Sequence, residues 1–133
     1  TCFDAIGDAL RETEATVILS TADHVDKAVG LKRTCPLLQH VVIVDEITPE
    51  RCKVESRMGV EVHSLFEVET SGRASTVSVS PPTASTPCAI LYSAGTSNGP
   101  RGAIHTHGSI VAGAAGCSKG EFGTVEQSDV LLD

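Results

Sequence analysis

Short runs of apolar residues recur along the chain, each long enough for one strand of a sheet. These runs lie at residues 16–20, 40–45, 60–64 and 88–92. The run at 40–45 is continuous and rich in β-branched residues, which is typical of a parallel strand buried on both faces. The run at 60–64 instead alternates apolar and polar positions with a period of two. The pattern predicts four strands, with room for a fifth.

Between these runs, apolar residues recur at helical spacing. One such set precedes the first run and another follows it: Phe3, Ile6 and Leu10, then Val25, Ala28 and Val29. Each set would place its members on one face of a helix. The second helix is expected to end before Pro36.

Two further helix starts are marked by capping residues. Thr48 and Pro49 combine an N-cap hydroxyl with proline at the first helical position, and an acidic residue follows. This helix is predicted to run to about Met58 and to stop at Gly59. Residues 64–67, Ser-Leu-Phe-Glu, have the spacing of a capping box and predict one more short helix.

The alternation of strands and helices predicts an α/β fold with a mostly parallel sheet and helices on both faces. Residues 1–70 carry the strand–helix repeats. Residues 71–87 are rich in Ser, Thr and Pro and are interpreted as a loop, with a weak strand at 77–79. Residues 88–133 hold the last strand, a glycine-rich segment and a following helix. All three parts are expected to belong to one truncated domain.

Composition and charge narrow the class of function. The chain has 133 residues, of which 41% are hydrophobic, and a net charge of −7. A general nucleic-acid or anionic-membrane binder needs an excess of Lys and Arg, so no nucleic-acid partner is expected. The five cysteines are irregularly spaced and include no C-x-x-C pair, which argues against a zinc or redox site. Reduced thiols are favoured over disulfides, with Cys35 and Cys88 interpreted as small core residues.

The most informative segment is 91–102, with the sequence LYSAGTSNGPRG. It directly follows the run at 88–92, which is predicted to be a buried strand, and its glycines let the backbone approach an anion closely. Thr96 and Ser97 supply hydroxyl donors, while Arg101 supplies a fixed cation for a charge-assisted contact. The segment is therefore a candidate phosphate-binding loop, although neither the Walker A spacing nor the dinucleotide glycine spacing fits. A plain Gly/Ser/Pro connection is the alternative.

Other polar residues have a simpler structural interpretation. His105 and His107 would share one face of a strand as metal ligands, but no third ligand converges on them, so no metal site is predicted. His40 and His63 lie at strand positions and are interpreted as partly buried structural groups. Residues 45–46, Asp-Glu, follow a strand, where α/β sites often form. An ordinary solvated turn is nevertheless the preferred interpretation.

The glycine-rich segment resembles the signature Y-T-S-G-T-T-G-x-P-K-G of the adenylate-forming enzymes, which include acyl-CoA synthetases, luciferases and peptide-synthetase adenylation domains. In an ungapped alignment the identical positions are Tyr92, Gly95, Thr96, Pro100 and Gly102. The close substitutions are Ser93, Ser97 and Arg101. Ala94 and Asn98 depart from the signature. Ala94 removes one hydroxyl, whereas asparagine tolerates the positive φ of the usual glycine.

The resemblance spans nearly the whole chain and is strongest over residues 88–107. Residues 103–107 resemble the strand-to-helix passage that follows the signature. The upstream pattern is similar to that of the long-chain fatty acyl-CoA synthetase branch. The resemblance implies about one subdomain of the large N-terminal domain of such an enzyme.

In this family a carboxylic acid attacks the α-phosphate of Mg²⁺-bound ATP, and the thiol of coenzyme A then displaces AMP. The resemblance therefore implies an AMP-forming long-chain fatty acid–CoA ligase that uses ATP, Mg²⁺ and coenzyme A. It also implies that the ATP phosphates are bound by a set of loop residues: Ser93, Ala94, Gly95, Thr96, Ser97, Asn98, Gly99 and Arg101. His107 would lie near the acyl pocket.

The family's Mg²⁺-binding Glu, ribose-binding Asp and catalytic Lys all lie downstream of this signature. This segment by itself is therefore expected to hold no catalytic residue and to be inactive. Its expected partners are the fatty acid substrate and the rest of a parent chain. An exposed edge that the parent buries would favour self-association. The parent is expected to be intracellular and peripheral to a membrane.

Two other functions stay open. A non-catalytic α/β interaction module, or a degenerate pseudoenzyme, is supported by Ala94 and Asn98. Within the family, another carboxylate–CoA ligase or an adenylation domain would carry the same signature. A flavodoxin-like mononucleotide domain is disfavoured, because residues 20–24 after the first strand contain no glycine.

Overall fold

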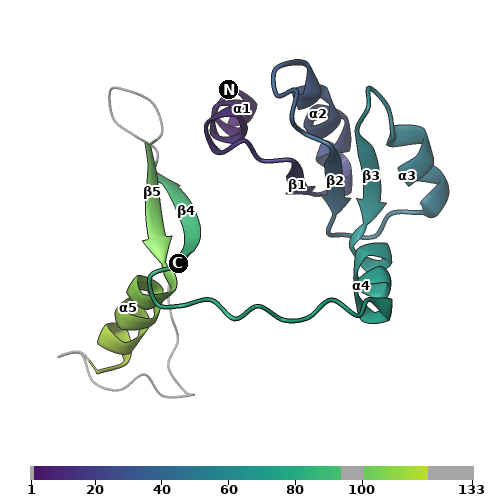
Figure 1. The fold of residues 1–133 in the computed structure, drawn as a ribbon. Coiled ribbons are helices and arrows are strands. Elements are labelled where there is room, and N and C mark those ends of the chain that lie inside the picture. Colours follow the sequence, from purple (N-terminus) through teal and green to yellow (C-terminus); the bar gives the residue numbers. More distant parts are fainter. Residues whose placement is uncertain (1, 94–100, 120–133) are drawn as a thin grey trace. The chain divides into compact units, whose positions relative to one another are not determined.

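The computed structural model describes residues 2–93 and 101–119, which fall into two compact units (Figure 1). The first unit lies within Thr1–Val77 and the second within Ser78–Asp133. Each unit has its own sheet. The division falls inside the Ser/Thr/Pro-rich stretch, where few apolar side chains are available to build a common core.

The first unit is built on a three-stranded parallel sheet in the order β1-β2-β3. The strands are β1 (Val17–Ser20), β2 (His40–Ile43) and β3 (Glu61–Ser64). In the register Val17 pairs with His40, and His40 in turn pairs with Glu61. The continuous apolar run of β2 therefore occupies the central strand, as its sequence predicts.

Helices connect these strands in alternation. They are α1 (Cys2–Thr13), α2 (Val25–Gly30), α3 (Pro49–Glu55) and α4 (Leu65–Ala74), with short 3₁₀ turns at Ala22–His24 and Leu31–Arg33. The predicted parallel α/β fold with flanking helices is confirmed. Each connection is long enough for the crossover that a parallel pair of strands needs.

The core of the first unit lies on one face of the sheet. Val41, Ile43 and Val62 share this face and are almost completely buried, because alternate residues of a strand, and their cross-strand partners, point the same way. Val25 and Val29 of α2 pack into the same cluster. This cluster supplies the hydrophobic stabilisation of the unit.

The opposite face of the sheet is only partly covered. α4 packs against β2 and β3, and Val42 on this face is buried. Val17 and Leu19 of β1 remain 44% and 64% exposed. The polar side chains of His40, Glu61 and His63 belong to this open face, because they alternate with the core residues.

Both predicted helix starts are confirmed in atomic detail. The Thr48 hydroxyl accepts a hydrogen bond from the Arg51 backbone N–H. The Ser64 hydroxyl accepts from the Glu67 N–H at 3.2 Å, and the Glu67 carboxylate accepts from the Ser64 N–H at 3.1 Å. The hydrogen bond from the Ser64 backbone N–H to the Glu67 carboxylate holds the pKa of that carboxyl group below its ordinary value. The result is the reciprocal capping box that the sequence spacing indicates.

Replacing Ser64 by alanine is expected to destabilise the first unit by about 1 kcal/mol, because the Glu67 N–H loses its acceptor at the helix start. The measurement is urea-induced unfolding followed by circular dichroism. Ser71→Ala is the matched control, since it makes the same change inside α4, where alanine is the better helix former. Equal losses for the two variants would contradict a capping role for Ser64.

Two element boundaries and one expected strand differ from the sequence prediction. α3 ends at Glu55 rather than Met58, because Ser56 leaves the helix and its hydroxyl accepts the Val62 N–H at 2.9 Å. Met58 and Gly59 have φ of 56° and 75° and form a turn into β3. α4 runs through Ala74, past the expected start of the loop. The weak strand expected at 77–79 is absent, and Val77 and Val79 are exposed.

The second unit contains an antiparallel pair of strands followed by a helix. The strands are β4 (Pro87–Ser93) and β5 (Arg101–Thr106), and the helix is α5 (His107–Lys119). β4 was expected to be buried, but most of its residues are exposed and it pairs only with β5 among the described strands. An apolar run alone does not distinguish a buried parallel strand from one arm of a hairpin.

The cysteines whose side chains the structure describes are all unpaired. Cys35 is buried, and its thiol donates to the Gly7 carbonyl. Cys52 is also buried. The expected core position of Cys88 is wrong, because Cys88 and Cys117 are exposed. Within the part of the chain that is described, no helix is both long and apolar enough to cross a membrane.

Candidate functional site

The hairpin of the second unit brings together the two ends of the glycine-rich segment. Ser93 is the last residue of β4 and Arg101 is the first of β5, and the two are cross-strand partners. Both are exposed. The other predicted phosphate-binding residues, Ala94, Gly95, Thr96, Ser97, Asn98 and Gly99, lie outside the described residues. A chain that leaves β4 at Ser93 must therefore return to the adjacent position at Arg101.

Alternation along the hairpin decides which residues share a face, and apolar residues lie on both faces. Ser93, Arg101 and His105 lie on one face, because they occupy paired or alternate positions of the two strands. Tyr92 and Gly102 form a cross-strand pair on the other face. The hydroxyl and guanidinium that could donate to a phosphate are thus neighbours on one surface.

Close packing explains why glycine is needed at position 102. A Cβ atom built on Gly102 would lie 2.8 Å from the Ile90 side chain and 3.0 Å from the Tyr92 ring. The Tyr92 ring therefore covers the Gly102 backbone. Tyr92 and Gly102 are two of the positions identical to the signature, and their role here is to pack the strands that carry the loop.

The passage from β5 into α5 is held by a second reciprocal cap. The Thr106 hydroxyl accepts from the Ser109 N–H at 3.2 Å, and the Ser109 hydroxyl accepts from the Thr106 N–H at 3.0 Å. His107 is half-buried, and its backbone N–H donates to the Thr86 carbonyl at 3.1 Å. The expected strand-to-helix passage is therefore present, and His107 begins the helix.

Replacing Gly108 by alanine is expected to destabilise the second unit by roughly 1–3 kcal/mol. The new Cβ atom would lie 2.9 Å from the Ala84 carbonyl oxygen, which also accepts the Gly108 N–H. Amide hydrogen exchange of α5 measures the loss. Gly113→Ala is the matched control in the same helix, since nothing lies within 4 Å of its Cβ position, and it should be neutral or stabilising. Unchanged protection in Gly108→Ala would contradict the close contact.

Charge is distributed unevenly along the chain. Residues 78–119 contain no Asp or Glu, and their fixed cations are Arg101 and Lys119. The whole chain nevertheless has a net charge of −7. Within residues 78–119, no negatively charged side chain would repel a polyanionic ligand. Counting charges over this segment alone would have given this signal from the sequence.

The carboxyl ends of the parallel strands do not suit a polyphosphate. Asp45, Glu46, Glu67 and Glu69 all line one open hollow there. Asp45 has a structural role, because its carboxylate accepts the Ala22 backbone N–H at 2.8 Å. The preferred interpretation of Asp45 as part of a turn is consistent with this bond.

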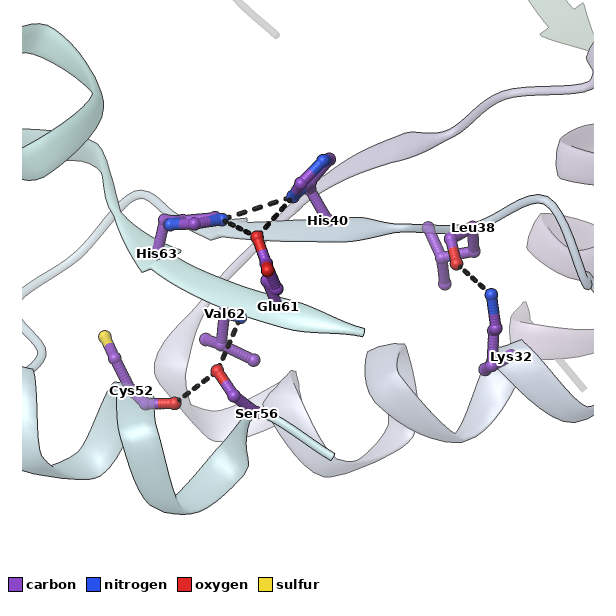
Figure 2. Close-up of polar contacts among 8 residues, drawn as sticks. All are labelled: Lys32, Leu38, His40, Cys52, Ser56, Glu61, Val62 and His63. Carbon is purple, nitrogen blue, oxygen red and sulfur yellow. Dashed lines mark hydrogen bonds and ion pairs between the residues drawn. The ribbon is translucent and has the colours of Figure 1, made fainter. Parts of the chain in front are cut away.

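A cluster on the open face of the first sheet was not anticipated. His40 Nδ1 lies 3.2 Å from His63 Nε2, and the Glu61 carboxylate lies 3.5 Å and 3.6 Å from these two nitrogens (Figure 2). Both histidines are half-buried, as expected. The pairing register of β2 and β3 produces the cluster, because it sets His40 opposite Glu61 and places His63 two residues further along β3. Within the described ranges, no third metal-ligating side chain joins His105 and His107.

Comparisons with known proteins agree on one family. The sequence profile described as "AMP-binding enzyme" matches residues 4–132. Among curated proteins, long-chain-fatty-acid–CoA ligase 1 of Cavia porcellus is 32% identical over 114 residues, covering 82% of this chain and 16% of its own length. The peroxisomal acyl-CoA ligase 891 of Penicillium roqueforti is 28% identical over 119 residues, covering 82% and 17%. The chain thus spans about a sixth of the length of these relatives.

Solved structures show the same fold. The adenylation domain of a carboxylate reductase from Mycobacterium chelonae superposes with a TM-score of 0.66 at 20% identity, covering 83% of this chain and 19% of that one. The didomain of the carboxylic acid reductase from Segniliparus rugosus, solved with AMP, gives 0.65 at 21% identity, covering 82% and 17%. At these low sequence identities the likeness shows a shared fold alone.

Proposed function

We propose that this chain, which belongs to the AMP-binding enzyme family, forms the ATP-phosphate-binding part of a fatty acid–CoA ligase. The coarse assignment to the AMP-forming ligase superfamily rests on the matched profile. The narrower assignment to a fatty acid–CoA ligase is supported by curated relatives named as long-chain-fatty-acid–CoA ligases. The observation that carries the phosphate-binding role is the pairing of Ser93 with Arg101 at the mouth of the glycine-rich loop.

The chemistry of adenylate formation requires charge neutralisation on a polyphosphate. A carboxylate attacks the α-phosphorus of ATP, pyrophosphate leaves, and negative charge moves onto the departing oxygens. Fixed N–H, hydroxyl and guanidinium donors stabilise that charge without reorganising during the reaction. A glycine-rich loop closed by the Ser93–Arg101 pair provides donors of all three kinds.

Each loop residue then has a defined task. Arg101 holds the β- and γ-phosphates through charge-assisted hydrogen bonds. Ser93, Thr96 and Ser97 donate hydroxyls, and Ala94, Gly95, Asn98 and Gly99 contribute backbone N–H groups. His107, at the start of α5, borders the acyl group. The thiol of coenzyme A then attacks the acyl carbonyl carbon, the bond to the AMP phosphate oxygen breaks, and AMP leaves.

The described part of the hairpin unit offers no carboxylate ligand for Mg²⁺. Hard cations prefer carboxylate oxygens, and residues 78–119 contain no carboxylate. In this proposal Mg²⁺ arrives as part of the ATP complex, and the ligands that it needs from protein belong to other parts of the enzyme. The residues of this chain act on the phosphates directly.

The remaining parts of the proposal concern partners and place. The partners are a fatty acid and the rest of a longer chain, since the curated relatives are about five times as long. Self-association of this segment through its exposed apolar edges is part of the same proposal. An intracellular location is supported by relatives named as peroxisomal.

The experiment is ATP–pyrophosphate exchange by the full-length protein with acetate, octanoate and palmitate in turn. Exchange that depends on palmitate is the expected result, and dependence on acetate alone would reassign the substrate to a short carboxylate. Absence of exchange with all three acids, from folded protein, would overturn the fatty acid assignment. Binding of ATP to that inactive protein would then favour another carboxylate, and its absence a pseudoenzyme.

A further inference from the structure

The open face of the parallel sheet carries a side-chain cluster for which the proposed function has no use. His40 projects from β2, and Glu61 and His63 project from β3. Figure 2 shows the two imidazole rings and the carboxylate directed toward one another. The cluster belongs to the first unit, whereas the glycine-rich hairpin belongs to the second. Its role therefore needs a separate explanation.

The spacing of the three side-chain atoms fits coordination of one shared metal ion better than a network of hydrogen bonds. The separations are 3.2, 3.5 and 3.6 Å between His40 Nδ1, His63 Nε2 and the Glu61 carboxylate oxygen. Ligands bound tetrahedrally at about 2.0–2.1 Å from one ion lie about 3.3–3.4 Å apart. The two distances to Glu61 are longer than normal hydrogen bonds. One cation placed between the three atoms would satisfy all of them.

Backbone geometry preorganises this arrangement. His40 and Glu61 are direct cross-strand partners, and His63 pairs with Val42 two residues along the same face. The strands are held in register by the central sheet, so the three ligands need no loop to be ordered before binding. The side chains remain 38%, 68% and 35% exposed for His40, Glu61 and His63. The three side chains are therefore accessible to an ion from solvent.

We propose that His40, Glu61 and His63 form a binding site for one divalent transition-metal ion such as Zn²⁺. Two imidazoles and one carboxylate are a ligand set used for zinc in sites that keep an open position. Imidazole nitrogens also discriminate against Mg²⁺ and Ca²⁺, which prefer oxygen ligands. The site is thus chemically distinct from the Mg²⁺ that accompanies ATP, and it ties β2 to β3.

The test is an isothermal calorimetric titration of the 133-residue chain with Zn²⁺ alone. One equivalent should bind and be removed by a chelator. Loss of a residue that only hydrogen-bonds to a metal ligand weakens binding roughly 10- to 100-fold. His63→Ala and Glu61→Gln remove ligands themselves, so each should weaken binding by more than this. The control is His105→Ala, because His105 lies in the second unit and should leave the titration unchanged.

Two further readouts separate this site from the free thiols and from misfolding. Co²⁺ bound to the cluster should give ligand-field bands without a sulfur-to-metal charge-transfer band. Zn²⁺ at about 100 times its dissociation constant should raise the Tm of the wild-type chain by roughly 5–10 °C. The metal-free Tm of Glu61→Gln should match that of the wild type. Absence of binding, equal binding by His63→Ala, or a thiolate spectrum would each overturn the proposal.

Discussion

Replacing Arg101 by alanine in the full-length protein is expected to lower kcat/KM for ATP by about 10- to 100-fold. A hydrogen bond to a charged group contributes roughly 1.5–3 kcal/mol, and each 1.4 kcal/mol is a factor of ten. Arg101 is the cation paired with Ser93 at the mouth of the loop. The measurement is the ATP dependence of pyrophosphate exchange with the preferred acid.

Two variants make this prediction specific. Arg101→Lys keeps the charge but not the planar fork of donors, so it should recover part of the loss. Arg73→Ala is the matched control, because Arg73 is an exposed residue of α4 paired with Glu69. It removes the same side chain from the first unit and should leave exchange unchanged. Wild-type kinetics in Arg101→Ala would remove the basis for the phosphate-binding role.

Replacing Ile43 by alanine is expected to destabilise the first unit by about 2–5 kcal/mol. Ile43 is fully buried on the central strand, between Ser20 of β1 and Ser64 of β3. Its truncation removes apolar contacts and leaves a cavity that the sheet cannot close. A domain of this size has a stability of only about 5–15 kcal/mol, so a large share is lost. The measurement is the midpoint of urea-induced unfolding.

A graded series checks that burial is the cause. Ile43→Val removes one methylene and should cost about 0.5–1.5 kcal/mol. Leu19→Ala, on the exposed face of β1, should stay within about 0.5 kcal/mol of the wild type. If Leu19→Ala were as damaging as Ile43→Ala, the open face of the sheet would have to be covered by other contacts.

Local signals predicted the first unit well. The capping residues Thr48 and Ser64 mark the starts of α3 and α4, because a hydroxyl acceptor at the N-cap acts within a single turn. The run at 40–45 predicted a central parallel strand, since a continuous run of β-branched residues is typical of a strand buried on both faces. These features depend on residues close together in the chain.

The ends of elements were predicted less well than the helix starts. Ser56 ends α3 early because its hydroxyl bonds to the Val62 N–H of the incoming strand. α4 continues past Ser71, where its composition indicated a loop, and the Thr70 hydroxyl bonds back to the Phe66 carbonyl within it. The expected strand at 77–79 finds no partner strand among the described residues. A strand needs such a partner to satisfy its backbone groups.

The sequence by itself determined the alternation of strands and helices in the first unit, the helix starts and the glycine-rich segment with its chemistry. Each depends on hydrophobic period, capping or turn residues that act over a few positions. Only the tertiary structure decided that Ser93 faces Arg101 and that His40, Glu61 and His63 converge. Those neighbours come from strand register, which is set by the packing of whole strands and not by any one residue.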